Sequence, residues 1–380
     1  MKKIGIITYP QIEDGKGRFL QAYALYCAIH SIGFEPTILN YKSELFNYKP
    51  SIKRAIKNVI KKPSELLAYF SVFLKRIKDK KAIENINISR DKYISFINEK
   101  MRYTEILNKE TLCNVADSYD AFVCGSDQIW NTHFACGLDP VYYLDFVKKG
   151  KRIAYAASMG TLNIDEKTIE RVIPLIKKID YCSVREKTTA ETLNSIYETK
   201  IQHVFDPTFL MDRKWWNNLA GEKVTDKEYV LVFTFDNNKA PLRWALRYAK
   251  AHSLQVLVIS DVKKTKKQIR NVGGLGPAEF VSLFKYAKCV FTQSFHGTVL
   301  SLLFEKEFYV FDRKNRSDVK GLILRIKDLL DEMMLGKRIV ENENDYWFSP
   351  IDYSFANTVI SKRKEEGLSF LKKSLLSAIK

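Results

Sequence analysis

Val290-Phe-Thr-Gln-Ser-Phe-His-Gly-Thr298, followed at once by Val299-Leu-Ser-Leu-Leu-Phe304, is the stretch around which the chain is organised. Its first half is short, uncharged and rich in β-branched and aromatic residues, which predicts a buried strand. Ser294 is a suitable N-cap for the helix that the apolar residues after it predict. A strand that turns directly into a helix N-terminus is a ready site for an anion.

His296 lies in this predicted turn, where the first N–H groups of the helix and the positive end of its dipole point outward. Gly297 has no side chain, so a ligand can approach the backbone there. A histidine in such a place can also transfer a proton near neutral pH. The alternative is that His296 only packs against or caps the turn, and these residues alone favour the two interpretations about equally.

The start of the chain has the same strand-to-helix pattern. Ile4-Gly-Ile-Ile-Thr8 predicts a buried strand, Asp14–Arg18 a glycine-bearing loop, and Phe19–Ile29 a helix. A doubly wound fold binds ligands at the carboxyl end of such a strand. Arg18 and Gln21 are therefore candidates for ligand contact, and a solvated loop charge is the alternative for Arg18.

Two later strands also end in polar side chains. The strand Tyr119–Cys124 runs into Gly125-Ser-Asp-Gln128, and Tyr181–Arg185 delivers Arg185 to the sheet edge. A carboxylate at such an edge can orient a sugar hydroxyl or act as a base, whereas the simpler role for Asp127 is to cap a turn.

Strands and helices alternate throughout, which favours parallel sheets. After a linker near 211–227 the pattern restarts with Tyr229-Val-Leu-Val-Phe-Thr-Phe235. We therefore predict an α/β protein with two Rossmann-like domains that face a cleft, a GT-B-like plan. The predicted parts are an N-terminal α/β domain (1–213) with a basic helical insert at about 49–98, a C-terminal α/β domain (228–340) and a helical tail (341–380).

The composition is that of an ordinary soluble globular protein, with 46% hydrophobic and 28% charged residues among 380. None of the six cysteines forms a C-x-x-C pair, and His133 with Cys136 has no second pair beside it, so no metal site is predicted. The apolar run after Met1 is too short for a signal peptide. No apolar stretch approaches the ~20 residues that span a bilayer, so we expect a cytoplasmic protein with reduced thiols.

The net charge of +18 is unevenly distributed. The segment from Lys49 to Lys81 holds eleven Lys or Arg and two acidic residues, and so carries half of the excess. Apolar residues are interleaved with the charges, which predicts two amphipathic helices broken at Pro63. They are either a solvated insert packed on its own domain or a patch that docks peripherally on the anionic inner face of the plasma membrane. Nucleic acid is disfavoured because no recognised binding motif accompanies the charge.

Five short motifs occur in a fixed order: Gly125–Asn131, Arg152–Ser158, Ser183–Glu186, Asp206-Pro207 and Ser294–Gly297. Together they resemble the polysaccharide pyruvyl transferase family, and the resemblance runs from Ile4 to about Met334. It implies transfer of the enolpyruvyl unit of phosphoenolpyruvate to a sugar diol of a cell-surface polysaccharide or its lipid-linked precursor. The product is a cyclic pyruvate ketal, and neither a cofactor nor a metal is required.

This chemistry needs an acid, cations for the donor, and a group for the acceptor. We expect His296 to be the general acid, Arg185 to bind the phosphate or carboxylate, and Asp127 to bind or deprotonate the acceptor. Some family members have an arginine where this chain has Ser294, so its phosphate site must rely more on Arg185, on other Lys or Arg residues, or on backbone N–H groups. Further substrate contacts are predicted at Arg18, Gln21, Gly125, Ser126, Gln128, Ser294, Gly297 and Thr298.

Two other functions are compatible with the sequence. A GT-B glycosyltransferase would use the same cleft for a nucleotide sugar, with Asp312 available for the ribose. The second alternative is that the chain is a non-catalytic, membrane-associated partner in polysaccharide assembly. The combination of His296, Arg185 and Asp127 favours an enzyme.

Overall fold

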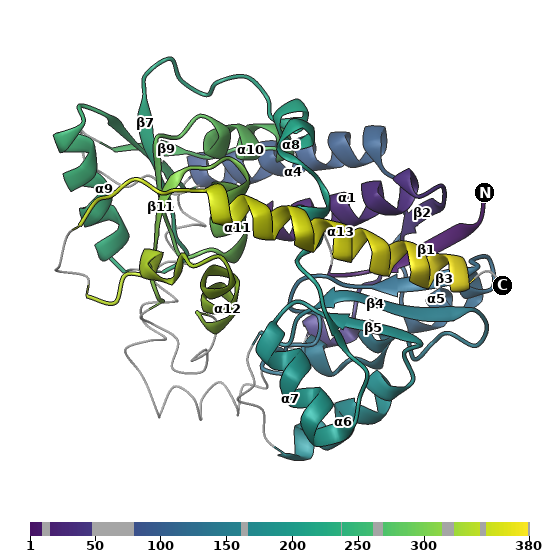
Figure 1. The fold of residues 1–380 in the computed structure, drawn as a ribbon. Helices are drawn as coiled ribbons and strands as arrows, with labels where there is room; N and C mark the ends of the chain where they lie inside the picture. Colours follow the sequence, from purple (N-terminus) through teal and green to yellow (C-terminus); the bar gives the residue numbers. More distant parts are fainter. Residues whose placement is uncertain are drawn as a thin grey trace, which may run out of the picture.

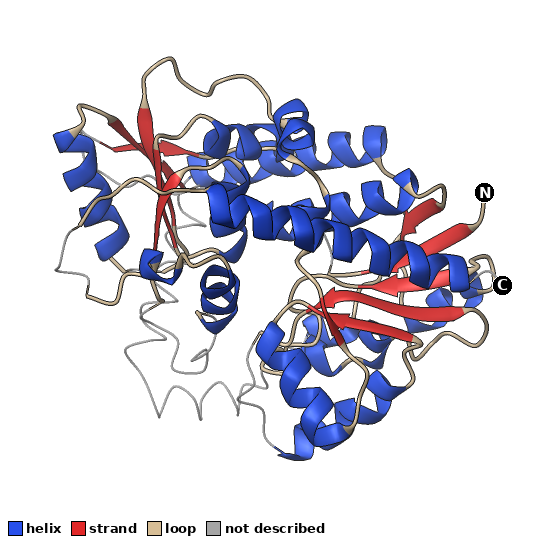
Figure 2. Ribbon diagram, viewed as in Figure 1, coloured by secondary structure: helices blue, strands red, loops and turns tan. Residues whose placement is uncertain are grey.

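Short runs of β-branched and aromatic residues form the strands of two parallel sheets (Figure 1, Figure 2). The structure, a computed structural model, describes residues 1–9, 16–47, 80–160, 166–236, 238–260, 269–313, 323–342 and 347–378. Each sheet and its helices form one α/β unit. The predicted fold class, α/β with two Rossmann-like units in a GT-B-like arrangement, is confirmed.

The sheet of the first unit has the strand order β2-β1-β3-β4-β5-β6, and its strands are parallel. Because β1 lies between β2 and β3, the direction of the connections reverses at β1 and β3, where open α/β sheets bind ligands. The strands are β1 (Lys3–Ile7), β2 (Glu35–Ile38), β3 (Ala121–Cys124), β4 (Lys151–Ala157), β5 (Tyr181–Val184) and β6 (Gln202–His203).

The sheet of the second unit has the order β11-β10-β7-β8-β9 and is also parallel. Its connections reverse between β7 and β10, which is again the expected place for a ligand. The strands are β7 (Tyr229–Phe233), β8 (Gln255–Ile259), β9 (Ile269–Val272), β10 (Cys289–Thr292) and β11 (Glu307–Val310).

Helices cover these sheets, and most positions agree with the sequence pattern (Figure 1). One difference matters for the site: α1 begins at Lys16, so Arg18 lies in the first turn of a helix and not in the predicted loop. The helices are α1 (Lys16–Ser31), α4 (Lys80–Lys100), α5 (Lys109–Ala116), α6 (Glu166–Lys177), α7 (Lys187–Tyr197), α8 (Arg213–Leu219), α9 (Ala240–Ala251), α10 (Pro277–Lys285), α11 (Phe295–Leu303), α12 (Leu324–Glu332) and α13 (Ser354–Ser377).

The two units share one apolar core. A single cluster of buried residues includes Phe19 of α1, Tyr93 of α4 and Phe280 of α10. Ser89 Oγ of α4 also donates a hydrogen bond to Leu275 O, at 2.6 Å. Burial of one large apolar side chain stabilises a protein by ~1.5–3 kcal/mol. The side chains of this shared core therefore stabilise the contact between the two units.

Helix α13 returns from the second unit to the first (Figure 1). It packs against α1, β4 and the short 3-10 helix η4 (Pro207–Leu210). Within the part of the chain that the structure describes, no helix combines the length and apolarity needed to cross a bilayer. Residues 48–79, which include most of the predicted basic segment, lie outside the described residues, and α4 includes the remainder of the predicted insert.

Candidate functional site

The carboxyl ends of the two sheets meet. Asp127 follows β3, Arg185 follows β5, and His296 follows β10. Carboxyl ends of parallel strands share one edge of a sheet, which explains why residues distant in sequence converge. The two edges come within direct contact, because His296 Nε2 of the second unit lies 3.6 Å from Asp206 Oδ2 of the first.

Arg185 is held by three neighbours in the first unit. Its Nε lies 3.3 Å from Glu186 Oε1, its Nη1 3.0 Å from Asp206 Oδ2, and its Nη2 3.0 Å from Ser158 Oγ. The side chain is 2% exposed, and its Cζ lies 4.1 Å from the ring centroid of Phe295. Burial acts to lower the pKa of Arg185, but the charges of Glu186 and Asp206 outweigh it and raise the pKa above its ordinary value. The predicted donor-binding cation is therefore a charged but buried and already paired group.

Asp206 joins the two units. Its Oδ2 accepts hydrogen bonds from Arg185 and from Ser126 Oγ, at 3.1 Å for the serine, and faces His296. Its Oδ1 accepts from the Thr208 N–H at 3.1 Å and hydroxyl at 2.8 Å. Burial opposes ionisation, but His296 and Arg185 hold the pKa of Asp206 well below its usual range. Asp206 is thus a fixed negative charge beside the imidazole.

His296 lies in the first turn of α11 between two surfaces. On one side is Gly17 of α1, where a Cβ would lie 2.5 Å from both Cβ and Nδ1 of His296. On the other side is Asp206. Nε2 of His296 is buried and has no hydrogen-bond partner among the residues that the structure describes. The imidazole is therefore fixed in place by packing, with Nε2 directed at the Asp206 carboxylate.

Ser294 is the N-cap of α11, as predicted. Its Oγ accepts from the Gly297 N–H at 3.2 Å, and its carbonyl accepts from the Thr298 N–H at 2.9 Å. Two of the N–H groups that were predicted to cradle a phosphate are therefore used within the protein. An anion at this helix end would depend more on side-chain cations.

Asp127 is paired across the first unit with Arg18. Arg18 Nε lies 3.4 Å from Asp127 Oδ2, and the Arg18 guanidinium lies 5.1 Å from the Tyr9 ring centroid. Burial acts to raise the pKa of Asp127, but Arg18 and then His296 hold the pKa below its ordinary value. Asp127 also has a backbone φ of 60°, a left-handed conformation that aspartate tolerates better than most residues. The Arg18 side chain is 28% exposed, so it is more accessible than Arg185.

Most of the other predicted contacts form the framework of the site. Gln21 donates to Thr8 Oγ1 at 3.2 Å and accepts from the Ser126 N–H at 2.9 Å, which ties α1 to the loop after β3. Gly125 has φ of 118°, and a Cβ there would lie 2.2 Å from the Tyr155 carbonyl oxygen. Internal contacts also engage Gln128, Gly297 and Thr298.

The sequence interpretation missed several members of the site. Asp206, Glu186 and Ser158 lie inside the quoted motifs, and that signal could have assigned them a role. Phe295 lies beside His296 in the sequence, but its contact with Arg185 depends on the packing of the two units. Arg325 of α12 also approaches this ring, with its Cζ 5.6 Å from the centroid. Nothing in the sequence indicated that Arg325, a single arginine in an amphipathic helix, belongs to the site.

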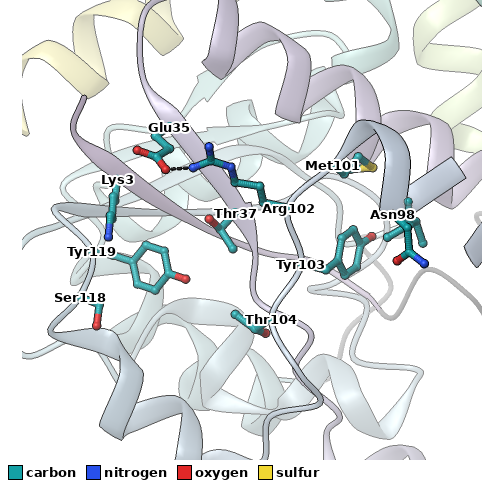
Figure 3. Close-up of a pocket in the computed structure, with 11 residues that line it drawn as sticks. Lys3, Glu35, Thr37, Asn98, Met101, Arg102, Tyr103, Thr104, Ser118 and Tyr119 are labelled. Atoms are coloured by element: carbon teal, nitrogen blue, oxygen red, sulfur yellow. Dashed lines mark ion pairs between the residues drawn. The ribbon is translucent and has the colours of Figure 1, made fainter. Parts of the chain in front are cut away.

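A separate pocket of about 710 Å³ lies at the opposite edge of the first sheet, near the starts of β1 and β2 (Figure 3). Its lining includes Lys3, Tyr103 and Tyr119, with Arg102 paired to Glu35. None of the predicted site residues lines it. In the described ranges, no group of three or more His, Cys, Asp or Glu side chains could hold a metal ion.

The comparison with known protein families agrees with the resemblance that the five motifs carry. The model of the family described as polysaccharide pyruvyl transferase matches residues 16–315. The search of curated proteins gives no match. Solved structures with a similar fold include the UDP-GlcNAc 2-epimerase of Methanocaldococcus jannaschii, with TM-score 0.49 and 13% identity over 97% of this chain and 93% of that chain. Another is the UDP-GlcNAc 2-epimerase of Neisseria meningitidis, with TM-score 0.47 and 10% identity over 96% of this chain and 100% of that chain.

Proposed function

Because the chain belongs to the polysaccharide pyruvyl transferase family, we propose that it uses phosphoenolpyruvate to form a pyruvate ketal on a sugar of a cell-surface polysaccharide or its lipid-linked precursor. The observation that carries this proposal is the meeting of His296, Arg185 and Asp127 at the facing edges of the two sheets. A histidine, a buried guanidinium group and an ionised carboxylate are groups suited to this reaction.

The reaction balances with two sugar hydroxyls and one donor molecule. C3 of phosphoenolpyruvate gains a proton, and C2 becomes electrophilic. The first hydroxyl oxygen forms a bond to C2, the bond between C2 and the phosphate oxygen breaks, and the second hydroxyl oxygen closes the ketal. Of the two hydroxyl protons, one replaces the proton delivered to C3 and the other leaves with the phosphate.

Each step has a group suited to it. His296 delivers the proton to C3, which contributes ~10²–10⁴-fold to the rate for a well-placed acid. Asp206, whose Oδ2 lies 3.6 Å from Nε2, orients the imidazole. Asp127, ionised at neutral pH, orients or deprotonates an acceptor hydroxyl. Arg185 stabilises the negative charge of the donor.

The deciding experiment incubates the full chain with phosphoenolpyruvate and a panel of lipid-linked sugars, and measures phosphate release and product mass. We expect phosphate release together with a product whose mass fits a ketal. His296→Ala should abolish turnover in a folded protein, whereas His252→Ala, an exposed histidine at the end of α9, should retain it. Turnover of a nucleotide sugar without use of phosphoenolpyruvate would instead support a glycosyltransferase.

A further inference from the structure

Phe235 places an exposed aromatic ring at the carboxyl edge of the second sheet. It follows β7, beside which the connections of this sheet reverse, and 53% of the residue is exposed. Among the aromatic side chains that the structure describes, Phe355 alone is similarly exposed. A single exposed phenylalanine is common on a protein surface, so the position of Phe235 at a ligand-binding edge is the significant feature.

The backbone that carries Phe235 is fixed to the turn that carries His296. The Phe235 N–H donates a hydrogen bond to Gln293 Oε1 at 3.0 Å. The buried Gln293 also donates from Nε2 to Asp236 Oδ1 at 2.8 Å and to Asp312 O at 3.1 Å. The loop after β7 is therefore tied to the residues that lead from β10 into α11.

The ring of Phe235 is held by its neighbours. Its centroid lies 5.0 Å from that of Phe233 and 4.2 Å from Cζ of Arg313. Phe233 is buried beside α11, since a Cβ at Gly297 would lie 3.3 Å from its Cδ1. One ring thus separates Phe235 from Gly297, the residue after His296. A ring that is held in place and more than half exposed offers a ligand a preformed surface.

The chemistry of an exposed ring at this place favours a sugar as its ligand. A pyranose has a face of C–H groups that can lie on the flat apolar face of an aromatic side chain, while its hydroxyls stay at the edge and form hydrogen bonds. Phosphoenolpyruvate is small and multiply charged, and has little apolar surface to place on a ring. A polysaccharide acceptor, which the family membership indicates, supplies such rings.

We propose that Phe235 is a stacking platform for a sugar ring of the acceptor, and that it contributes to acceptor specificity beside the reaction centre. This inference rests on the proposed function for the identity of the acceptor. The platform contacts the acceptor away from the bonds that change, so its loss should weaken acceptor binding and leave the chemical step unaltered.

The first test is saturation-transfer NMR of the full chain without donor, with glucose, galactose, N-acetylglucosamine and N-acetylmannosamine as separate probes. We expect the protein to transfer saturation to at least one of them. Its dissociation constant should rise about tenfold in Phe235→Ala, equivalent to ~1.4 kcal/mol, the scale of one aromatic stacking contact. Phe235→Tyr keeps the ring and should bind like the unmodified protein, whereas Phe235→Leu, apolar but not flat, should resemble Phe235→Ala.

Phe355→Ala is the matched control, because it removes an exposed phenylalanine at the start of α13. Asn357 of the same helix donates a hydrogen bond to Glu305, which lies beyond the C-terminal end of α11, whereas Phe235 lies near its N-terminal end. Phe355→Ala should therefore bind the sugar like the unmodified protein.

Steady-state kinetics with a water-soluble acceptor give a second readout. Phe235→Ala should raise KM for the acceptor and leave kcat and KM for phosphoenolpyruvate unchanged, which a general loss of structure would not do.

Saturation transfer to none of the four sugars, or equal affinity in Phe235→Ala, would overturn the platform. A loss of UDP binding in Phe235→Ala without a loss of sugar binding would also overturn it, and would assign the ring to a nucleotide. If a sugar binds through Phe235 but phosphoenolpyruvate releases no phosphate, the platform stands and the proposed donor fails.

Discussion

At the scale of single residues, the contacts of Arg185 depend on the planar, forked shape of its guanidinium group. Its three nitrogens contact three acceptors in different directions, and its plane lies over Phe295. A lysine ammonium retains the charge but cannot reproduce this fork. We therefore expect Arg185→Lys to lower kcat by at least about 10²-fold, the usual effect of losing one fixed donor to transition-state charge.

The same substitution should also destabilise the protein, because Glu186 and Asp206 remain buried with a poorer partner. Breaking a buried ion pair costs ~3–5 kcal/mol, and the lysine charge should reduce this loss. Steady-state kinetics and urea unfolding measure the two effects. Arg102→Lys is a suitable control, since Arg102 forms an exposed ion pair with Glu35 far from the site. Full activity in Arg185→Lys would show that its guanidinium has no special role.

The sequence identified the candidate residues whose side chains are typical of catalysis or ligand binding. His296, Arg185 and Asp127 each end a predicted strand or begin a predicted helix, so the rule for parallel sheets places each of them at the carboxyl edge of its own sheet. It did not identify Arg325, because an arginine in an amphipathic helix is usually a solvated charge. Only the packing of α12 against α11 shows that this arginine is buried.

At the scale of elements, the contact of α1 with α11 fixes the imidazole. A Cβ at Gly17 would lie 2.5 Å from two atoms of His296, which is closer than carbon atoms can approach. Alanine is ordinarily favoured over glycine in a helix by up to ~1 kcal/mol. We therefore expect Gly17→Ala to lower kcat by about tenfold or more through displacement of His296, and to forfeit the usual gain in stability.

Kinetic assays and thermal melts of Gly17→Ala test this prediction. Gly221→Ala is the matched control, because the nearest atom to a Cβ there is at 3.6 Å, an ordinary contact distance. If Gly17→Ala were more stable and as active as the unmodified protein, α1 would not position the imidazole.

Most elements followed from the alternation of apolar strands and helices, but not the start of α1. Glycines at 15 and 17 and the charged residues around them indicate a loop, yet the helix begins at Lys16. The close packing of α1 on His296 requires the small residue at Gly17, so tertiary contact overrides local preference there. Strand β9 was also missed, because Arg270 and Asn271 interrupt its apolar pattern.

At the scale of the whole molecule, acid should weaken the fold. Burial, and then the charge of Arg363 on α13, lowers the pKa of His203 to about 4. The pKa of an unfolded histidine is ~6.5, so the unfolded chain binds this proton first as the pH falls. The free energy of unfolding is therefore unaffected by His203 above about pH 6.5. As the pH falls from about 6.5 to about 4, the free energy of unfolding decreases by at most ~1.4 kcal/mol per pH unit for this one proton.

Asp127 and Asp206 act in the same direction at lower pH, because their folded pKa values lie below the ordinary values. Urea unfolding at pH 7.5, 6, 5 and 4 measures the trend. His203→Gln should flatten the curve between pH 6.5 and 4, whereas His30→Gln, an exposed histidine of α1, should leave it unchanged. Stability that stays level from pH 7 to 4 would contradict the prediction.

The two units were predictable because the strand pattern restarts after the linker, at Tyr229. The return of α13 to the first unit was not, since an amphipathic helix at the end of a chain can pack on either unit. Its apolar residues Phe370, Leu371 and Leu375 are buried, and the helix packs against α1, β4 and η4 of the first unit.

The uneven charge of the whole chain leads to the last prediction. The segment from Lys49 to Lys81, with eleven Lys or Arg and two acidic residues, lies outside the described residues for all but its last two positions. Each basic residue near an anionic membrane contributes ~1 kcal/mol, and interleaved apolar residues such as Leu66 and Phe70 add to the attraction. We expect the protein to sediment with anionic vesicles at low salt and to be released at 1 M salt, where the Debye length is ~3 Å.

Neutral vesicles provide the first control for this sedimentation. Two charge-removal variants provide the second: Lys53→Gln with Arg54→Gln and Lys57→Gln inside the segment, and Lys362→Gln with Lys372→Gln and Lys373→Gln on α13. Both triple variants remove the same number of charges, but only the first should reduce binding strongly, because electrostatic attraction acts through charges close to the surface. Equal binding to neutral and anionic vesicles, or an equal loss in both variants, would assign the excess charge to general solubility. Phosphate release from phosphoenolpyruvate with a water-soluble acceptor should be unaffected in either case, since membrane docking affects only the encounter with an acceptor carried on a lipid.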